Sequence, residues 1–287
     1  MKVIIQIPCL NEEETLPATL ADLPREIDGV DEIETLVIDD GSTDRTIEVA
    51  KGCGVDHIVK LPNNRGLATG FQAGLDACLK LGADIIVNTD ADNQYSGDDI
   101  PKLVAPILAG EAEMVVGDRE VADIDHFSPA KKVLQKFGSW VVRRLSDTEV
   151  TDATSGFRAY NQEAALQLLV VDNFTYTLES LIQAGKGSVA VGEVKISTNA
   201  KTRESRLFGS TSAYVRRNGL AILRIYTRYE PLKVFSFLGL IAAIAALAAW
   251  MPFLVDWILN GDRDGHIQSL LLGAVLFIVS IQLFALG

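Results

Sequence analysis

Cysteine and histidine are scarce in this chain of 287 residues, which contains three of each. The cysteines at positions 9, 53 and 78 are too few and too widely spaced for a disulfide framework or a zinc site. We therefore expect ordinary reduced thiols. None of the three histidines lies in a motif, which disfavours chemistry that depends on a Ser-His-Asp triad.

Two glycine-rich motifs for nucleotide binding are absent as well. No G-x-G-x-x-G follows the first predicted strand, which disfavours a dinucleotide-dependent oxidoreductase. No Walker A segment ending in Gly-Lys-Ser/Thr is found, which disfavours a P-loop ATPase. The first residues read as a strand without a signal peptide, so we expect them to belong to the folded domain.

Positive charge is in the minority over most of the sequence. The formal net charge is −12, and residues 1–194 are strongly acidic. An acidic body of this kind argues against a nucleic-acid partner. Residues 195–233 are the exception, with nine basic residues against two acidic ones.

The region before residue 120 alternates short apolar runs with longer segments that have a helical pattern. The runs at 4–7, 34–38, 55–60, 83–87 and 113–117 predict strands. The expected helices begin around residues 11–14 and cover 66–81 and 98–108. This alternation indicates βαβ units and a mostly parallel sheet, and therefore an α/β fold.

Five polar clusters follow these predicted strands, at residues 8–12, 39–44, 63–66, 90–94 and 118–119. Turn chemistry explains any one of them. The carboxyl ends of parallel strands meet at one edge of a sheet, where open α/β sheets bind their ligands. The five clusters together therefore predict a nucleotide site at that edge.

The cluster Asp90-Ala91-Asp92 carries two carboxylates directly after a buried strand, with Gln94 two positions further on. Hard oxygen ligands on such a loop suit Mg²⁺ or Mn²⁺, which would use a substrate phosphate to complete its coordination shell. Loop or helix-capping carboxylates are the alternative interpretation of Asp90 and Asp92.

Two uncharged apolar stretches lie near the C-terminus, at residues 234–255 and 267–287. Each is long enough to cross a hydrocarbon core of about 30 Å as a helix. Neither has a polar face, so membrane insertion is favoured over burial in a soluble core. The basic band precedes the first span and the loop at 256–266 is acidic, which predicts a cytoplasmic N-terminal domain at a cell membrane crossed twice.

The order and spacing of several motifs resemble a known family. They are Pro-Cys-Leu-Asn-Glu at 8–12, Val-Ile-Asp-Asp-Gly-Ser-Thr-Asp at 37–44, Asn-Arg-Gly at 64–66 and Asp-Ala-Asp-Asn-Gln at 90–94. They resemble the family 2 glycosyltransferases of GT-A fold. Asp-Ala-Thr-Ser-Gly-Phe-Arg-Ala-Tyr at 152–160 narrows the resemblance to the dolichyl-phosphate mannose or glucose synthase group.

The resemblance covers about residues 3–210. It implies a Rossmann-like GT-A catalytic domain at 1–209 with a mostly parallel sheet. We expect a basic amphipathic juxtamembrane helix at 210–233 to follow, and then a two-helix transmembrane hairpin at 234–287.

The resemblance also implies roles at the donor site. The residues expected to contact a nucleotide-diphosphate sugar are Pro8, Asn11, Glu12, Asp39, Asp40, Arg65, Asp90 and Ala91. The expected ligands of Mg²⁺ or Mn²⁺ are Asp90, Asp92 and Gln94. The metal would bridge the donor diphosphate and neutralise the leaving group. For Asp39 a turn-forming role, and for Arg65 a solvated surface position, are the alternatives.

The acceptor in this group is a dolichyl or other polyprenyl phosphate, which requires positive charge around it. The residues expected to contact this phosphate are Arg119, Lys132, Lys136, Ser139, Arg158, Arg203 and Arg206. Residues 128–145 read as a basic amphipathic helix suited to a membrane surface. The expected catalytic residues are Asp92, Arg119 and Asp152, and Asp152 orients either the acceptor or a basic residue.

These expectations describe an inverting, metal-dependent hexosyltransferase that acts at the cytoplasmic membrane face. The residues at 8–44 do not distinguish GDP-mannose from UDP-glucose or UDP-N-acetylglucosamine as the donor. A non-catalytic membrane adaptor that retains the fold is an alternative of another class. A nucleotidyltransferase is disfavoured because residues 8–12 do not form a glycine-rich basic loop. Oligomeric state is not predicted.

Overall fold

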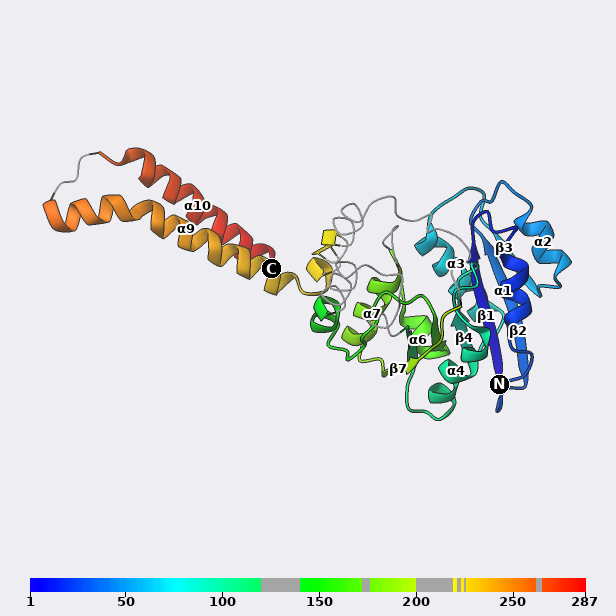
Figure 1. Ribbon diagram of the computed structural model, residues 1–287. Helices are drawn as coiled ribbons and strands as arrows, with labels where there is room; N and C mark the ends of the chain where they lie inside the picture. The colour runs from blue at the N-terminus through cyan, green and yellow to red at the C-terminus, as the bar shows by residue number, and fades with distance from the viewer. Residues whose placement is uncertain (120–139, 172–175, 200–218, 221–222, 225, 262–264) are drawn as a thin grey trace. The chain divides into compact units, whose positions relative to one another are not determined.

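The computed structural model describes residues 1–119, 140–171, 176–199, 219–220, 223–224, 226–261 and 265–287. The chain divides into two compact units, Met1–Ile222 and Leu223–Gly287. The first unit contains a single seven-stranded sheet (Figure 1). The second contains a pair of long apolar helices.

The sheet has the strand order β3-β2-β1-β4-β6-β5-β7. Its strands are β1 (Lys2–Cys9), β2 (Glu32–Asp39), β3 (His57–Lys60), β4 (Ile85–Asn88), β5 (Met114–Asp118), β6 (Arg158–Asn161) and β7 (Val191–Lys195). The four strands β1 to β4 run parallel, and β5 pairs in parallel with β7. β6 lies between β4 and β5 and is antiparallel to both.

The mostly parallel α/β fold expected from the sequence is confirmed, but β6 and β7 were not predicted. β6 begins within the motif at 152–160 and ends one residue beyond it, and this stretch lacks the apolar run that is typical of a buried strand. The predicted start of the first helix around residues 11–14 was too early, because helix α1 covers Leu16–Asp22. Asn11 has a left-handed φ of 55°, which no α-helix accommodates.

Helices cover both faces of the sheet. Side chains alternate between the two faces along each strand. Ile5 of β1 faces the core that includes Leu103 of α4 (Ile100–Leu108). Gln6 faces α3 (Leu67–Lys80), where Gly74 leaves no room for a side chain against the Gln6 amide. Further helices among the described residues of this unit are α2 (Thr46–Gly52), the 3-10 turn η1 (Gly97–Asp99), α6 (Gln162–Gln167) and α7 (Tyr176–Lys186), and residues 140–146 are helical as well.

The second unit is a hairpin of α9 (Pro231–Asn260) and α10 (Ile267–Leu286) (Figure 1). Both helices are long and apolar enough to cross a membrane, and most of their large side chains are exposed. The two helices contact each other closely where the Ser280 hydroxyl donates to the Gly239 carbonyl at 2.8 Å and the Trp250 indole donates to the Leu270 carbonyl at 3.2 Å. These two bonds hold the helices in register, while the outward apolar side chains suit a lipid environment.

Candidate active site

The loops after β1 and β2 are joined at the carboxyl edge of the sheet. The backbone N–H of Asn11 donates to the Ser42 hydroxyl at 2.9 Å, and its side-chain oxygen accepts from the Thr43 N–H at 2.8 Å. The N–H of Glu12 donates to the Thr46 hydroxyl at 2.9 Å. Two of the predicted clusters, which are far apart in sequence, therefore form one surface.

Asp40 joins a third loop to this surface. Its two carboxylate oxygens accept from the backbone N–H groups of Arg65 and Gly66, at 2.7 and 2.8 Å. Gly41 makes the close approach possible, because a Cβ at its φ of 78° would lie 2.6 Å from the Asn63 carbonyl carbon. Both oxygens of Asp40 are thus engaged in holding the loop, and the Arg65 side chain is left exposed at its surface.

Asp39 differs from Asp40 in having an unused oxygen. The side chain is fully buried, and its Oδ1 accepts from the Ser42 N–H at 3.1 Å. Its Oδ2 is buried without a hydrogen-bond partner among the described residues. A buried carboxylate oxygen left without a donor is costly, so it calls for a donor such as a ribose hydroxyl or a base N–H. Of the two adjacent carboxylates, Asp39 is the one suited to a ligand.

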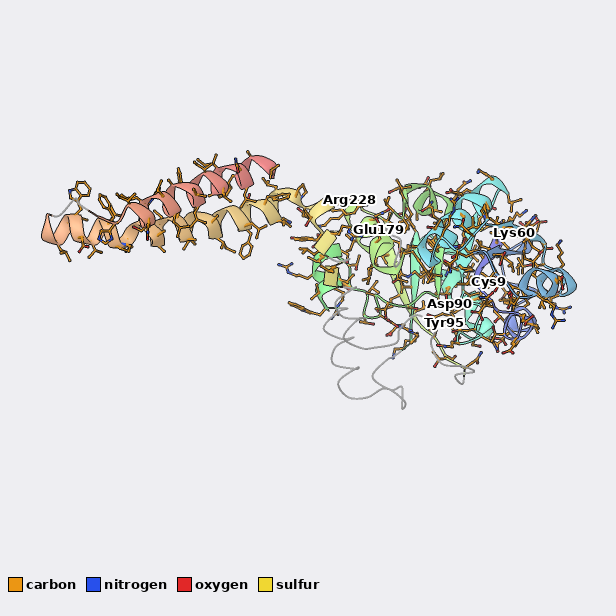
Figure 2. The ribbon with its side chains drawn as sticks, turned by 90° about the horizontal axis from the view of Figure 1, so that it is seen from above. Cys9, Lys60, Asp90, Tyr95, Glu179 and Arg228 are labelled. Carbon is orange, nitrogen blue, oxygen red and sulfur yellow. The ribbon has the colours of Figure 1, made fainter. Side chains whose placement is uncertain are left out.

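The loop after β4 presents Asp90 and Asp92 beside this surface. Figure 2 marks Asp90 near Cys9 and Tyr95. Asp90 packs against Gly156, where a Cβ would lie 3.3 Å from its Oδ2. Asp92 accepts at Oδ1 from the Gln94 N–H at 3.2 Å and at Oδ2 from the Gln94 amide at 2.9 Å. Predicted metal ligands Asp90, Asp92 and Gln94 therefore share one short loop.

Burial and neighbouring negative charge destabilise the ionised form of Asp90 in this loop. Burial, followed by the negative charges of Asp92 and Glu12, raises the pKa of Asp90 to about 7, although the positive charge of Arg119 acts in the opposite direction. A charge cluster of this kind is relieved by a cation. The donor set of two carboxylates and an amide fits Mg²⁺ or Mn²⁺ that takes its remaining ligands from phosphate and water.

A closed metal cage is not formed by the protein alone. Over the part of the chain that the structure describes, no group of three or more His, Cys, Asp or Glu side chains is arranged to hold a metal ion. This agrees with the chemistry of Mg²⁺, which usually binds one or two carboxylates plus substrate phosphates.

Arg119 follows β5 and is held by Asp152. Its Nε donates to Asp152 Oδ2 at 2.6 Å and its Nη2 donates to Oδ1 at 2.9 Å. Nη2 also donates to the Thr154 hydroxyl at 2.9 Å, and that hydroxyl donates to Asp152 at 3.0 Å. Burial by itself would raise the pKa of Asp152, but the charge and hydrogen bonds of Arg119 outweigh it and lower the pKa below its usual range.

This pairing defines what Asp152 does in the protein. Both oxygens are bonded to Arg119 and the carboxylate is buried. Of the two roles expected from the sequence, the geometry matches orientation of a basic residue. Arg119 is part-exposed and keeps a fixed direction at the edge where the other loops meet.

The expectation that Arg158 contacts an acceptor phosphate is wrong. Its side chain is fully buried at the start of β6. Its Nε donates to the Ser155 carbonyl and its Nη2 to the Ala153 carbonyl, at 2.8 and 2.9 Å. Its Nη1 donates to the Thr177 carbonyl and the Ser180 hydroxyl, both at 2.8 Å. Arg158 therefore joins the 152–156 loop to α7 and is unavailable to a ligand.

The other predicted residues fall in several places. Pro8 is half-buried at the end of β1, and Ala91 is buried with its carbonyl accepting from the Thr19 hydroxyl at 3.0 Å. The expected residues that lie outside the described part are Lys132, Lys136, Ser139, Arg203 and Arg206. Of the predicted helix at 128–145, residues 140–145 are described and are helical, and half of the residues of the predicted helix at 210–233 also lie outside the described part.

Two aromatic residues at this edge were missed by the sequence analysis. The Tyr95 hydroxyl accepts from the Gly156 N–H at 3.0 Å, and its ring stacks on Phe157 with centroids 4.9 Å apart. The Tyr176 hydroxyl accepts from the Asn88 amide at 2.9 Å behind the same glycine. They support the backbone that packs on Asp90. Of these two residues, only Tyr95 could have been found from the sequence, because it directly follows the predicted metal ligand Gln94.

Comparison with known proteins agrees with this geometry. The model of the family described as "Glycosyl transferase family 2" matches residues 4–169. A UDP-N-acetylglucosamine–dolichyl-phosphate N-acetylglucosaminyltransferase of Methanococcus voltae is 30% identical over 68% of this chain and 85% of its own length. An undecaprenyl-phosphate mannosyltransferase of Micrococcus luteus is 30% identical over 81% of this chain and 98% of its own.

Solved structures show the same fold. Glucosyl-3-phosphoglycerate synthase of Mycobacterium tuberculosis, crystallised with Mn²⁺, UDP and glucosyl-3-phosphoglycerate, superposes with a TM-score of 0.59 at 22% identity. The superposition covers 77% of this chain and 79% of that one. Fold, edge geometry and the extent of the family match lead to one conclusion: this chain belongs to glycosyl transferase family 2.

Proposed function

We propose that this protein transfers a hexose from a nucleotide-diphosphate sugar to a polyprenyl phosphate, with a divalent metal ion and with inversion at the anomeric carbon. The observation that carries the proposal is the juxtaposition of two opposite features at one sheet edge. Asp90 and Asp92 offer ligands for a cation that binds a diphosphate, and Arg119 offers a fixed guanidinium for a second phosphate.

The donor would lie on the side of β1 and β2. Asp39, with its unpartnered buried oxygen, is the residue suited to the nucleoside, and Asp40 keeps the neighbouring loop in place. Asp90, Asp92 and Gln94 would hold Mg²⁺ or Mn²⁺, which neutralises the departing diphosphate. The Mn²⁺ and UDP in the glucosyl-3-phosphoglycerate synthase crystals support the use of a divalent ion and a nucleotide-diphosphate donor.

The acceptor supplies its own nucleophile. A phosphate monoester has a second pKa of about 6, so it is largely ionised at pH 7. One of its oxygens attacks the anomeric carbon, the bond from that carbon to the diphosphate oxygen breaks, and the nucleoside diphosphate leaves with the electron pair. This step inverts the anomeric centre and needs no protein base. The protein has to bring two anions together, which is the role we give Arg119.

The apolar hairpin supports a lipid as the acceptor. α9 and α10 would anchor the chain in the membrane that contains a polyprenyl phosphate. The two relatives from Methanococcus voltae and Micrococcus luteus are named for dolichyl and undecaprenyl phosphate acceptors. The basic band at 195–233 favours a cytoplasmic catalytic domain.

The two relatives are named for the transfer of different sugars, so the donor of this protein is identified by testing several nucleotide sugars. Membranes containing the protein are incubated with polyprenyl phosphate and radiolabelled GDP-mannose, UDP-glucose or UDP-N-acetylglucosamine. We expect label in the lipid fraction with one donor and loss of that label with EDTA. Absence of lipid label with every donor would contradict the enzyme and favour the non-catalytic adaptor.

Asp92→Ala gives the matching test of the metal assignment. We expect it to abolish transfer and to leave the protein folded. Asp98→Asn is the control, because Asp98 is an exposed carboxylate on the neighbouring turn η1. Full activity of Asp92→Ala, or equal loss in both variants, would remove the metal role from this loop.

A further inference from the structure

The segment that leaves β7 returns to the Asp90–Gln94 loop. The backbone N–H of Asn199 donates to the Gln94 carbonyl at 2.9 Å. The Asn199 side-chain amide donates to the Asn93 carbonyl at 3.1 Å. Next to these residues, Thr198 pairs with Tyr95 in an isolated antiparallel bridge. Asn199 therefore holds two consecutive carbonyls of the loop that carries the proposed metal ligands.

The loop needs such a support because of its backbone at Asn93. This residue adopts a left-handed conformation with a φ of 54°. Non-glycine residues reach this region at an energetic cost and keep it only where their surroundings enforce it. The reversal at Asn93 is also what brings the Gln94 N–H and amide back onto the Asp92 carboxylate. The geometry of the ligands thus depends on this one turn.

The segment that bears Asn199 is itself anchored at its other end. The Ile196 N–H donates to the Asp118 carbonyl at 2.9 Å, directly before Arg119. The Ser197 hydroxyl donates to Asp99 Oδ2 at 2.8 Å, and the Ser197 N–H donates to the same oxygen. Asp99 is buried and stays fixed at the start of α4. Asn199 is consequently presented to the loop from a fixed strand end.

We propose that Asn199 is a positioning residue for the metal site. Any residue except proline at this position can donate its backbone N–H to the Gln94 carbonyl, but the bond to the Asn93 carbonyl comes from the Asn199 side-chain amide. That bond keeps Asn93 in its left-handed turn and so keeps Asp92 and Gln94 directed at one point. The inference rests on the proposed function, since it assigns Asn199 to the metal site proposed there.

The test measures metal binding directly in the full-length protein in detergent. Free Mn²⁺ is followed by electron paramagnetic resonance during titration, once in the presence of UDP and once in the presence of GDP. We expect Asn199→Ala to weaken Mn²⁺ binding about tenfold, in the range found when residues that orient metal ligands are removed. Once Mn²⁺ saturates the variant, kcat should return close to the wild-type value.

Ser197→Ala is the matched control, because it removes only the hydroxyl bond to Asp99, keeps the backbone N–H bond that anchors the segment, and does not touch the Asp90–Gln94 loop. We expect it to bind Mn²⁺ as the wild type does. Wild-type affinity in Asn199→Ala, or equal weakening in Ser197→Ala, would overturn the inference and leave the proposed function standing. A wild-type protein that binds no Mn²⁺ with either nucleotide would overturn the metal assignment, and the inference with it.

Discussion

Asp152 binds Arg119 through two hydrogen bonds, from Nε to Oδ2 at 2.6 Å and from Nη2 to Oδ1 at 2.9 Å. The pair joins the end of β5 to the loop before β6. A bidentate pair of this kind fixes the plane of the guanidinium as well as its position. Arg119 is therefore available to a ligand in one orientation only.

Asp152→Asn should disorder this arrangement while preserving the size of the side chain. The amide offers only one acceptor oxygen, so Arg119 loses a bond and its charge loses its counter-charge. We expect kcat/KM for the lipid phosphate to fall about 100-fold, because misplacement of a positioning group by about 1 Å has effects of that size. Donor binding, measured by nucleotide titration, should change little. Equal loss of donor binding would place Asp152 in the donor site instead.

The same pair predicts a pH dependence of stability. The pKa of Asp152 is lowered from its model-compound value of 3.8 by Arg119, which outweighs the opposite effect of burial. The stabilisation is therefore complete above about pH 4, and it is lost as the pH falls through the lowered pKa in the folded protein.

Urea unfolding of the wild type and Asp152→Asn from pH 3 to pH 7 measures this effect. We expect the difference in free energy of unfolding to be constant from pH 5 to pH 7 and to shrink below pH 4. A difference that stays constant down to pH 3 would show that the carboxylate charge contributes no stability.

Arg158→Met should lower the free energy of unfolding without changing the rate of sugar transfer by the folded protein. It leaves the Ser155, Thr177 and Ala153 carbonyls without their donor in a buried site. The expected loss is about 3 kcal/mol, since each unsatisfied buried group costs about 1–3 kcal/mol and part of this is relieved by relaxation. Denaturant titration measures it, with the exposed Arg144→Met as control. A lipid-phosphate KM raised in the folded fraction would restore Arg158 to the acceptor site.

Asp39→Asn tests whether the buried Oδ2 of Asp39 accepts a hydrogen bond from the bound nucleoside. The remaining side-chain oxygen still accepts from the Ser42 N–H, so the protein should fold. The nucleoside loses a charged acceptor, and hydrogen bonds to charged groups contribute about 1.5–3 kcal/mol. We expect the dissociation constant of the bound nucleoside diphosphate to rise at least tenfold in a calorimetric titration. The exposed Asp28→Asn serves as the control. Unchanged affinity would leave Asp39 with a purely local role.

Cys53 offers a test of the membrane orientation. All three cysteines are free, but Cys9 and Cys78 are buried and Cys53 is exposed. A membrane-impermeant maleimide should therefore modify Cys53 alone. If the catalytic domain is cytoplasmic, as the basic band predicts, intact cells should protect Cys53 and lysed cells should not. Labelling of intact cells to the same extent would place the domain on the opposite side. Cys53→Ser controls for other reactive groups.

Local pattern was enough to predict much of this protein. Short apolar runs and their polar ends identified β1, β2, β4 and β5, because a buried parallel strand must be apolar and must end where water and ligands begin. The same logic brought Asp39 and Asp90 to one edge. The two uncharged stretches predicted α9 and α10, since their length and composition alone decide whether a helix suits a bilayer.

Tertiary structure decided what each of those residues does. Asp39 and Asp40 are neighbours in sequence, yet the packing of the 63–66 loop uses both oxygens of Asp40, while Oδ2 of Asp39 has no hydrogen-bond partner among the described residues. Arg119 and Arg158 are both arginines in or beside motifs, but one is directed to the edge by Asp152 and the other is enclosed between a loop and α7. Contacts between residues far apart in the chain depend on strand order and packing. The periodicity of one stretch of sequence therefore does not predict them.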